Sequence, residues 1–305
     1  MNAIRSGLSR TIVGLPLLLA LLLAATSEDF RQARNLTNFA GQIAALLIAS
    51  LGQLFTTLVG GIDLSVGALM SLTSCIVATQ GDPVAGIALA LAAGMLVGLV
   101  NGWGVAVAGV HPLIMTLGTA TCVQGLCHFV LPIPGGQVPA ALAAAAGTTE
   151  AGLPLSLPWC VAAIAAVGVL LGRTRLGLHL HAVGSQARSA YLNGVPARAV
   201  VMFAYIACSV MAVVAGIYLT ARVSAGDPAL GSAFALESVA AVALGGVQLT
   251  GGVGSVAGVT AGALTLGLLT NGLNLFGVSP FMRGVLTGCL LLAAVSLQRR
   301  RIVGM

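Results

Sequence analysis

The sequence predicts an all-α integral membrane protein, and three observations support this fold class. Apolar residues make up 58% of the 305-residue chain, charged residues only 7%, and the mean hydropathy is +1.06. An ordinary globular domain carries roughly 25% charged residues, so 13 basic and 7 acidic side chains cannot cover a water-soluble protein of this size. The apolar runs are long and do not alternate, which favours spanning helices of about 20 residues over barrel strands of about ten.

We expect one transmembrane domain over residues 1–305, with about ten spans. The spans are expected near residues 11–27, 38–59, 64–80, 84–108, 113–131, 155–172, 199–221, 235–250, 254–275 and 281–298. Glycine recurs at every fourth position at Gly94, Gly98 and Gly102, and again between Gly254 and Gly262. Small residues at this spacing let helix backbones approach closely, so these glycines predict tight packing between spans.

The distribution of arginine orients the spans, because cytosolic loops of membrane proteins carry an excess of basic residues. All 13 basic residues are arginines, in three main clusters: Arg5 and Arg10, four residues within 173–198, and three within 299–301. Six expected spans separate the first two clusters and four separate the last two, so all three clusters and both termini are expected in the cytosol. Four arginines do not fit this pattern: Arg31, Arg34, Arg222 and Arg283.

The first span has a second interpretation. Arg5 and Arg10, followed by the apolar run 12–25 and small residues, also have the pattern of a secretory signal peptide. Cleavage would leave nine spans and place the amino terminus outside. The arginine distribution favours a retained helix, and whether it is cleaved stays open. The Pro- and Gly-rich stretch 132–154 is expected to be a non-cytosolic re-entrant or surface segment, and its role is also open.

Two stretches of the chain are similar to each other. Asn101-Gly102 is followed by Gly109-Val110-His111-Pro112, and Asn271-Gly272 is followed by Gly277-Val278-Ser279-Pro280. Five expected helices separate the two copies, so they would face opposite sides of the membrane. An inverted repeat of this kind is typical of transporters. The alternative is a chance match between two stretches rich in Gly, Ala and Leu.

Few polar groups fall at membrane depth, where their cost suggests a function. Asp63 lies in the sequence GGIDLSVG, where it can cap the following helix, contact a transport path, or do both. Glu237 is expected in the first turn of the eighth span, where the helix dipole also favours an acid. The amides and the hydroxyl can equally make hydrogen bonds between helices. The candidates for a substrate pathway are Asp63, Asn101, Thr116, Glu237, Gln248, Asn271 and Asn274.

Several classes of function are excluded by what the sequence lacks. Without lysine, the chain can hold neither a Walker A phosphate loop nor a Schiff base. The four histidines have no metal-ligand spacing, no Ser/His/Asp set is visible, and the scattered arginines do not suggest a nucleic-acid surface. The six cysteines lie in apolar stretches and are expected to be buried rather than paired in disulfides. We therefore expect neither an enzyme nor a metal site.

The polar stretch 173–198 differs from every other loop. It is basic, contains no acid and is too long for a simple turn. Within it, Ser185–Gly194 predicts two to three helical turns that end at Gly194 and Pro196. A short cytosolic helix could transmit force to a peripheral partner, while the alternative is a solvated charged loop.

These motifs resemble a known family. The resemblance rests on the sequences GGIDLSVG (60–67), HPLIMTLGT (111–119), VAAVALGGVQLTGGVGS (239–255) and NGLNLFGVSP (271–280), together with residues 182–194. They cover most of residues 40–298 and resemble the permease subunit of bacterial ABC importers for ribose, xylose, autoinducer-2 and related solutes. The segments GGIDLSVG and Leu244-Gly245-Gly246 carry the most specific part of the resemblance.

The resemblance implies a multi-pass permease of the bacterial inner (cytoplasmic) membrane that works as a dimer. It implies a separate cytosolic ATPase that binds ATP and Mg, so this chain would carry no cofactor, and a periplasmic binding protein that delivers a monosaccharide or related small polar solute. The alternative is an ion-coupled secondary transporter, which the shortage of carboxylates at membrane depth disfavours. Which solute is carried, and whether the second permease is identical, stay open.

The resemblance also implies that residues 182–194 dock the ATPase. The candidate docking residues are Gly184, Ser185, Gln186, Arg188, Ala190, Leu192, Asn193 and Gly194. The chain departs from the family here, because Arg188 stands where the family usually has glutamate and Tyr191 where it has arginine. Only Glu237 remains of the family's acidic pair before the eighth span, with Ala235 at the other position. On this basis, ATP binding by the partner should draw the docking helices together and tilt the segments near 60–67 and 237–256.

Overall fold

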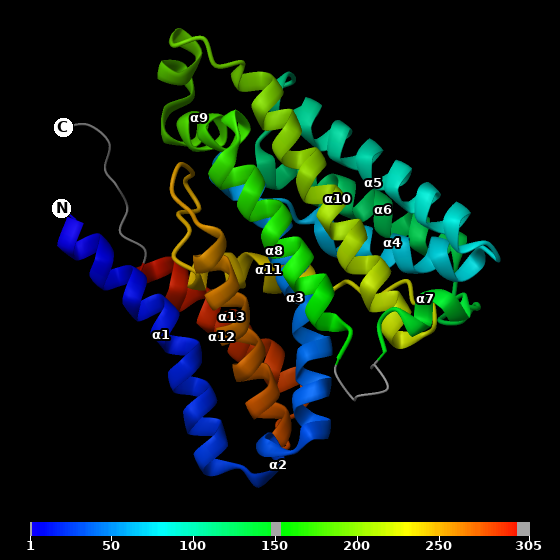
Figure 1. Cartoon of the computed structure of the whole chain (residues 1–305). Helices are drawn as coiled ribbons and strands as arrows, with labels where there is room; N and C mark the ends of the chain where they lie inside the picture. Colours follow the sequence, from blue (N-terminus) through cyan, green and yellow to red (C-terminus); the bar gives the residue numbers. More distant parts are fainter. Residues whose placement is uncertain (1, 148–153, 298–305) are drawn as a thin grey trace.

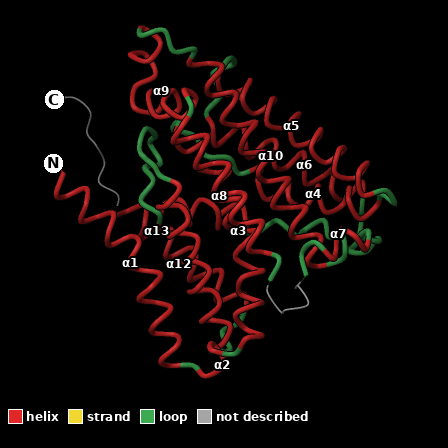
Figure 2. Tube along the Cα trace, viewed as in Figure 1, coloured by secondary structure: helices red, strands yellow, loops and turns green. Residues whose placement is uncertain are grey.

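The computed structural model describes residues 2–147 and 154–297, and the described chain is almost entirely helical (Figure 2). Outside the helices, Gly135 and Gly226 form an isolated β-bridge. The helices are α1 (Asn2–Thr26), α2 (Glu28–Arg31), α3 (Ala33–Leu58), α4 (Ser65–Thr79), α5 (Pro83–Ala106), α6 (Pro112–Val130), α7 (Ala140–Ala144), α8 (Ser156–Arg173), α9 (Arg175–Leu192), α10 (Ala197–Val223), α11 (Phe234–Leu244), α12 (Val256–Leu275) and α13 (Pro280–Leu297).

A helix lies in each of the ten segments expected to span the membrane. Six of the described helices, α3, α5, α6, α8, α10 and α12, are long and apolar enough to cross a bilayer by length and composition. The expectation of a continuous span over 235–250 is wrong, because α11 ends at Leu244 after 11 residues. The glycines that follow the helix adopt left-handed backbone angles, with φ of 72° at Gly246 and 96° at Gly251. A helix of this length reaches only about 16 Å, whereas the hydrocarbon core is about 30 Å thick.

The centre of the molecule is the antiparallel pair α3 and α10, which lie against each other along most of their length. Gly41 near the start of α3 faces Arg222 at the end of α10, and Gly52 faces Met211 in the middle. Tyr205, near the start of α10, reaches Gly61 just beyond the end of α3. The side chains along the buried part of α3, from 43 to 58, are almost all enclosed.

Glycine faces let the other helices pack closely on this pair. In α5, Gly94, Gly98 and Gly102 lie directly on α10, where added Cβ atoms would meet α10 backbone or side-chain atoms within 3 Å. In α12, Gly258 and Gly262 lie against α11 and the start of the turn after it in the same way. The tight packing that the glycine spacing predicted is confirmed at both places.

The outside of the bundle is apolar. Large side chains of α5, α6, α8 and α13 point outward without any protein neighbour covering them, including Leu96, Ile114, Phe129, Val161 and Phe281. Phe129 and Phe281 are 85% and 89% exposed. Soluble monomers rarely expose apolar surface on this scale. Together with the six long apolar helices, this surface identifies a multi-pass membrane protein.

The six cysteines carry no disulfide, as expected, but they are not all buried. Cys75, Cys127 and Cys208 are buried, whereas Cys122 and Cys289 are exposed on the apolar outside. A thiol behaves as a small apolar group, so its exposure on an apolar surface that faces lipid costs little free energy.

Helix α9 is longer than the short helix expected over 185–194. It begins at Arg175, and its first half is helical because Leu180 and Val183 are buried against the bundle. Gln186 has non-helical angles (φ −164°, ψ 97°), so α9 bends there into two parts. The predicted end is confirmed, since the helix stops at Leu192 and Gly194 takes a left-handed φ of 82°.

Candidate functional site

Two interruptions between helices lie beside α9 at one end of the bundle, which we call the α9 end (Figure 1). The first break, residues 59–64, separates α3 from α4, and the second break, residues 245–255, separates α11 from α12. The second break bonds directly to the end of α3, where the first break begins, because the Gly252 amide donates to the Leu58 carbonyl oxygen at 2.8 Å.

Gly184 of α9 lies where the two breaks meet. A Cβ added to Gly184 would overlap the Leu58 carbonyl oxygen and the Gly252 amide nitrogen, so no side chain fits. Ser185 lies against Gly252, whose own φ of 76° also favours glycine. We call Leu58, Gly184, Ser185 and Gly252 the junction. It joins α9 to the end of α3 and to the second break mainly through backbone contacts.

His181 makes a second connection between α9 and the second break. Its Nδ1 lies 2.8 Å from the Gly177 carbonyl oxygen within α9, and its Nε2 lies 3.3 Å from the Gly254 carbonyl oxygen. Both partners only accept hydrogen bonds, so a neutral imidazole satisfies one of them and an imidazolium satisfies both. The sequence reasoning considered His181 only as a metal ligand and missed this contact.

Asp63 anchors a buried polar network in the first break. Its Oδ1 accepts hydrogen bonds from the Ser65 amide at 2.9 Å and the Ser65 hydroxyl at 2.5 Å. Asp63 thus satisfies the first backbone amide of α4 from one residue before the N-cap position, which Leu64 occupies. Asn101 of α5 donates to Ser65 Oγ at 3.0 Å, and Thr119 of α6 donates to Asn101 Oδ1 at 2.7 Å. The network therefore ties the first break to α5 and α6.

The backbone of the first break is held from two further sides. The buried Gln53 amide, oriented to satisfy both its ends, donates to the Asp63 carbonyl oxygen and accepts from the Asp63 amide, each at 3.0 Å. Thr116 of α6 donates to the Ile62 carbonyl oxygen at 3.1 Å. Burial raises the pKa of Asp63 to about 6, although the Ser65 hydrogen bonds oppose the shift. Asp63 Oδ2 accepts no hydrogen bond within the described part of the chain.

The seven candidate pathway residues do not form one site. Asp63, Asn101 and Thr116 belong to the network just described, and Gln248 lies in the second break, where its backbone bonds to Val253 and Gly251. Asn271 exchanges hydrogen bonds with Asn35 of α3 at 3.0 and 3.3 Å, near the opposite end of the bundle. Asn274 is exposed close by.

Glu237 lies in the first turn of α11, as expected. With Gln42 and Thr270 it borders a cavity of about 30 Å³ between α3, α11 and α12. A cavity of this size has room for about one water molecule and none for a monosaccharide.

The candidate docking residues mostly face outward at the α9 end. Of the eight, all are exposed except Gly184, which is half-buried at the junction, and Ala190, which is buried under the second part of α9. The exposed surface of this second part includes Arg188 and two large side chains, Tyr191 and Leu192, which are 69% and 75% exposed. Ala190 anchors the segment, and its neighbours are free for a partner.

Comparison with known proteins decides the family. The family model described as "Branched-chain amino acid transport system / permease component" matches residues 35–295. The chain belongs to this family of permeases. The expectation of a permease, drawn from the sequence motifs, is therefore confirmed.

Individual relatives match the permease over nearly its full length. It is 33% identical to the probable ABC transporter permease protein y4mJ of Sinorhizobium fredii, over 95% of this chain and 90% of the relative. It is 33% identical to the ribose import permease protein RbsC of Bacillus subtilis, over 93% and 90%. It is 32% identical to the D-allose transport system permease protein AlsC of Escherichia coli, over 93% and 89%. No solved structure matches the chain.

Proposed function

We propose that this chain is the membrane-spanning permease subunit of an ATP-driven ABC importer that carries a monosaccharide or a related small polar solute. The observation that carries the proposal is the near-full-length similarity to ribose and allose import permeases, combined with an outward-facing docking segment on α9. ATP and Mg would be bound by a separate cytosolic ATPase, and a periplasmic binding protein would deliver the solute. No step of ATP hydrolysis would fall on this chain.

The whole chain would form one domain in the bacterial inner membrane, with both termini in the cytosol. Ten segments would cross the membrane, and the eighth would do so as the short helix α11 together with the non-helical residues 245–255 that follow it. The four arginines between residues 173 and 198 lie on or beside α9, which supports placing the α9 end in the cytosol. Retention of α1 is supported by Leu23, which is buried against Gly272 of α12 and would leave apolar surface behind if removed.

An inverted repeat is supported by the way the helices pack. In the proposed repeat, α3, α4, α5 and α6 of the first half correspond to α10, α11, α12 and α13 of the second half. If the repeat is real, two helices in contact should have counterparts that are also in contact. The pair α5–α10 becomes α12–α3, α4–α10 becomes α11–α3, and α4–α6 becomes α11–α13, and every one of these pairs is in contact. The central pair α3–α10 is exchanged with itself, as expected for two elements beside a pseudo-two-fold axis.

The two similar sequence stretches also end their helices alike, which supports the same repeat. Gly109 after α5 and Gly277 after α12 have φ of 70° and 72°. The next residues, Val110 and Val278, each bond back to the preceding helix at 3.0 and 2.9 Å. A proline then begins the next helix in both copies. If the similarity between the two sequence stretches were due to chance, they would not be expected to end their helices with the same backbone turn.

In this proposal, the junction converts movement of α9 into movement of both breaks. When the ATPases of a permease dimer close on ATP, they would draw the two docking segments together. Because Gly184 contacts the end of α3 and the second break without an intervening side chain, displacement of α9 would pull on both at once. Asp63, Asn101 and Thr116 would keep α4, α5 and α6 moving as a unit with the first break. Glu237, Gln248, Asn271 and Asn274 remain the proposed contacts of the solute along its path.

Uptake of labelled solutes tests the class of substrate. The chain would be co-expressed with its ATPase and binding protein in cells that lack their own ribose, allose, arabinose and leucine importers. We expect uptake of one of the sugars and none of leucine, above cells that carry the ATPase and the binding protein alone. Accumulation of leucine without any sugar would contradict the proposed substrate class while leaving the family assignment intact.

A further inference from the structure

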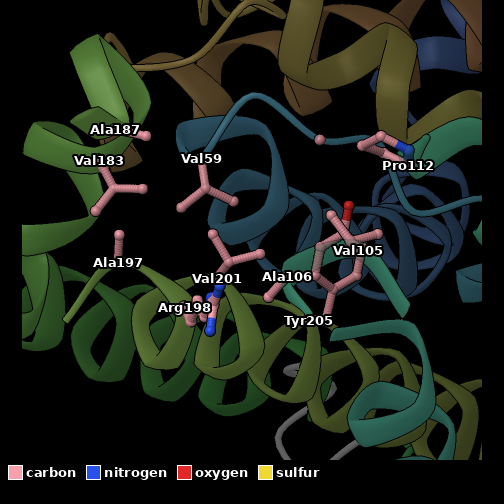
Figure 3. A pocket seen from close by; sticks show the side chains of 11 residues that line it. Val59, Val105, Ala106, Pro112, Val183, Ala187, Ala197, Arg198, Val201 and Tyr205 are labelled. Atoms are coloured by element: carbon pink, nitrogen blue, oxygen red, sulfur yellow. The ribbon is translucent and has the colours of Figure 1, made fainter. Parts of the chain in front are cut away.

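A cavity lies beside α9 that none of the transport steps above uses. It has a volume of about 270 Å³ and is partly open to the surface. Its walls are mainly apolar, and Figure 3 shows Val59, Val105, Val183 and Val201 around a common space. These side chains come from the first break, the end of α5, α9 and the start of α10, so the cavity lies where four parts of the chain meet.

One cationic group stands at this cavity. Arg198, in the first turn of α10, is exposed and lines the cavity. The ion pair formed within the described residues is Arg31–Glu28, so Arg198 has no carboxylate partner there. The 27-residue helix α10 begins at Ala197, and Pro196 at the N-cap position supplies no side-chain hydrogen bond. The amino terminus of the helix adds partial positive charge. The two together favour an anion.

A second polar group is independent of the first. The side chain of Tyr205 is fully buried, its hydroxyl finds no hydrogen-bond partner among the described residues, and it lines the same cavity. A buried hydroxyl left without a partner costs free energy. A ligand oxygen in the cavity would supply the missing partner. An arginine and an orphaned hydroxyl beside apolar walls therefore indicate a ligand with polar oxygens, negative charge and an apolar chain.

The position of the cavity selects among such ligands. It lies at the carboxyl end of α5 and at the amino ends of α6 and α10. The proposed orientation places these helix ends at the cytosolic boundary of the bilayer, and the inference rests on that part of the proposed function. At this depth the abundant anionic amphiphile is phospholipid, whose phosphate lies level with the helix ends and whose acyl chains lie below. We propose that the cavity binds one anionic phospholipid, with its phosphate at Arg198 and the amino terminus of α10, and the upper part of an acyl chain along the valines.

Such a lipid would touch the part of the molecule that moves. Val183 and Ala187 lie in α9 on either side of its bend at Gln186, and both line the cavity. A bound lipid would therefore bridge the docking helix to α5 and α10. The anionic lipid content of the membrane would then influence how firmly α9 is held against the bundle.

Lipid binding is measurable on the purified full-length chain without ATPase or solute, so failure here would not be confused with failure of transport. Native mass spectrometry in a neutral detergent would follow titration with dioleoylphosphatidylglycerol, dioleoylphosphatidylcholine and soluble glycerol phosphate. We expect one phosphatidylglycerol to bind about tenfold more tightly than phosphatidylcholine, because its headgroup has a net negative charge, whereas the choline cation of phosphatidylcholine is repelled by Arg198 and the helix terminus. Glycerol phosphate should neither bind nor displace the lipid.

Matched variants locate the site. Arg198→Gln should abolish the preference for phosphatidylglycerol, whereas Arg173→Gln, an exposed arginine of α8 that does not line the cavity, should keep it. Ala106→Phe should fill the cavity and weaken both lipids, and Tyr205→Phe should weaken phosphatidylglycerol while leaving the melting temperature unchanged or higher. An unchanged preference in Arg198→Gln would overturn the proposal, as would displacement by glycerol phosphate, which would indicate a site for a soluble anion.

Discussion

Gly184 has the least freedom to change of any residue at the junction. The space that a Cβ would need is taken by the Leu58 carbonyl oxygen and the Gly252 amide nitrogen, and these two groups belong to backbones that bond to each other. A flexible neighbouring side chain could move aside, but two bonded backbones cannot do so without breaking their contact.

We expect Gly184→Ala to destabilise the protein by about 1–3 kcal/mol, the usual cost of overpacking, and to lower solute uptake. The melting temperature in detergent and the uptake rate would both be measured. Gly168→Ala in α8 is the matched control, since nothing lies within 4 Å of its added Cβ, and it should be neutral or slightly stabilising because alanine favours helix. Equal behaviour of the two variants would show that the junction is not tight.

At the residue scale, sequence reasoning succeeded where the environment is local. One of the two roles considered for Asp63, accepting a hydrogen bond from a free amide at the start of the following helix, is confirmed, although Leu64 occupies the N-cap position. Glu237 lies in a first helical turn as predicted. Both features depend on neighbours within a few residues. The pairing of Asn271 with Asn35 could not be predicted in the same way, since the partners are 236 residues apart. Gln53 and Tyr205 carried a usable signal, as polar groups inside apolar helices, but no partner could be named for either.

Among the elements, α9 depends on its connection to the second break. His181 supplies this connection through the Gly254 carbonyl oxygen, whereas His179, two residues earlier on the same helix, has no such hydrogen bond within the described chain. The pair offers a comparison of the same residue type on the same helix.

We expect His181→Ala to reduce the amount of solute imported per ATP hydrolysed by about fivefold, which corresponds to the loss of one hydrogen bond. The reason is that α9 would still bind the ATPase but would move the second break less effectively. The ratio would be measured in proteoliposomes with the ATPase and binding protein present, and His179→Ala should leave it unchanged. If both variants lower the ratio equally, the Gly254 contact has no part in coupling.

The elements themselves followed from the hydropathy pattern, and two boundaries did not. α11 ends at Leu244 because the glycine-rich stretch after it turns, although its apolar composition reads as a continuing span. α9 begins ten residues earlier than the helix expected over 185–194, because Leu180 and Val183 are buried against the bundle. The start of α9 was therefore decided by tertiary contacts, which local composition does not contain, and the end of α11 by backbone turns at glycines, which a hydropathy pattern does not register.

For the whole molecule, the charge pattern and the packing support the same arrangement. The proposal of two halves that move about the central pair α3 and α10 rests on the basic residues near α9 and on the matching helix contacts around that pair. The absence of lysine from the sequence removes a Walker A nucleotide site from this chain, so the energy for import must come from another subunit or from an ion gradient. An ATPase subunit and an ion gradient predict opposite results when solute uptake is measured with the ATPase inactivated.

The most direct test of the account is solute uptake into membrane vesicles that carry this chain, its binding protein and either an active ATPase or one inactivated at its Walker A lysine. We predict that uptake requires the active ATPase and continues when ionophores abolish the ion gradients in the presence of ATP. Uptake that persists with the inactive ATPase and stops when the gradients are abolished would contradict the account and identify an ion-coupled carrier.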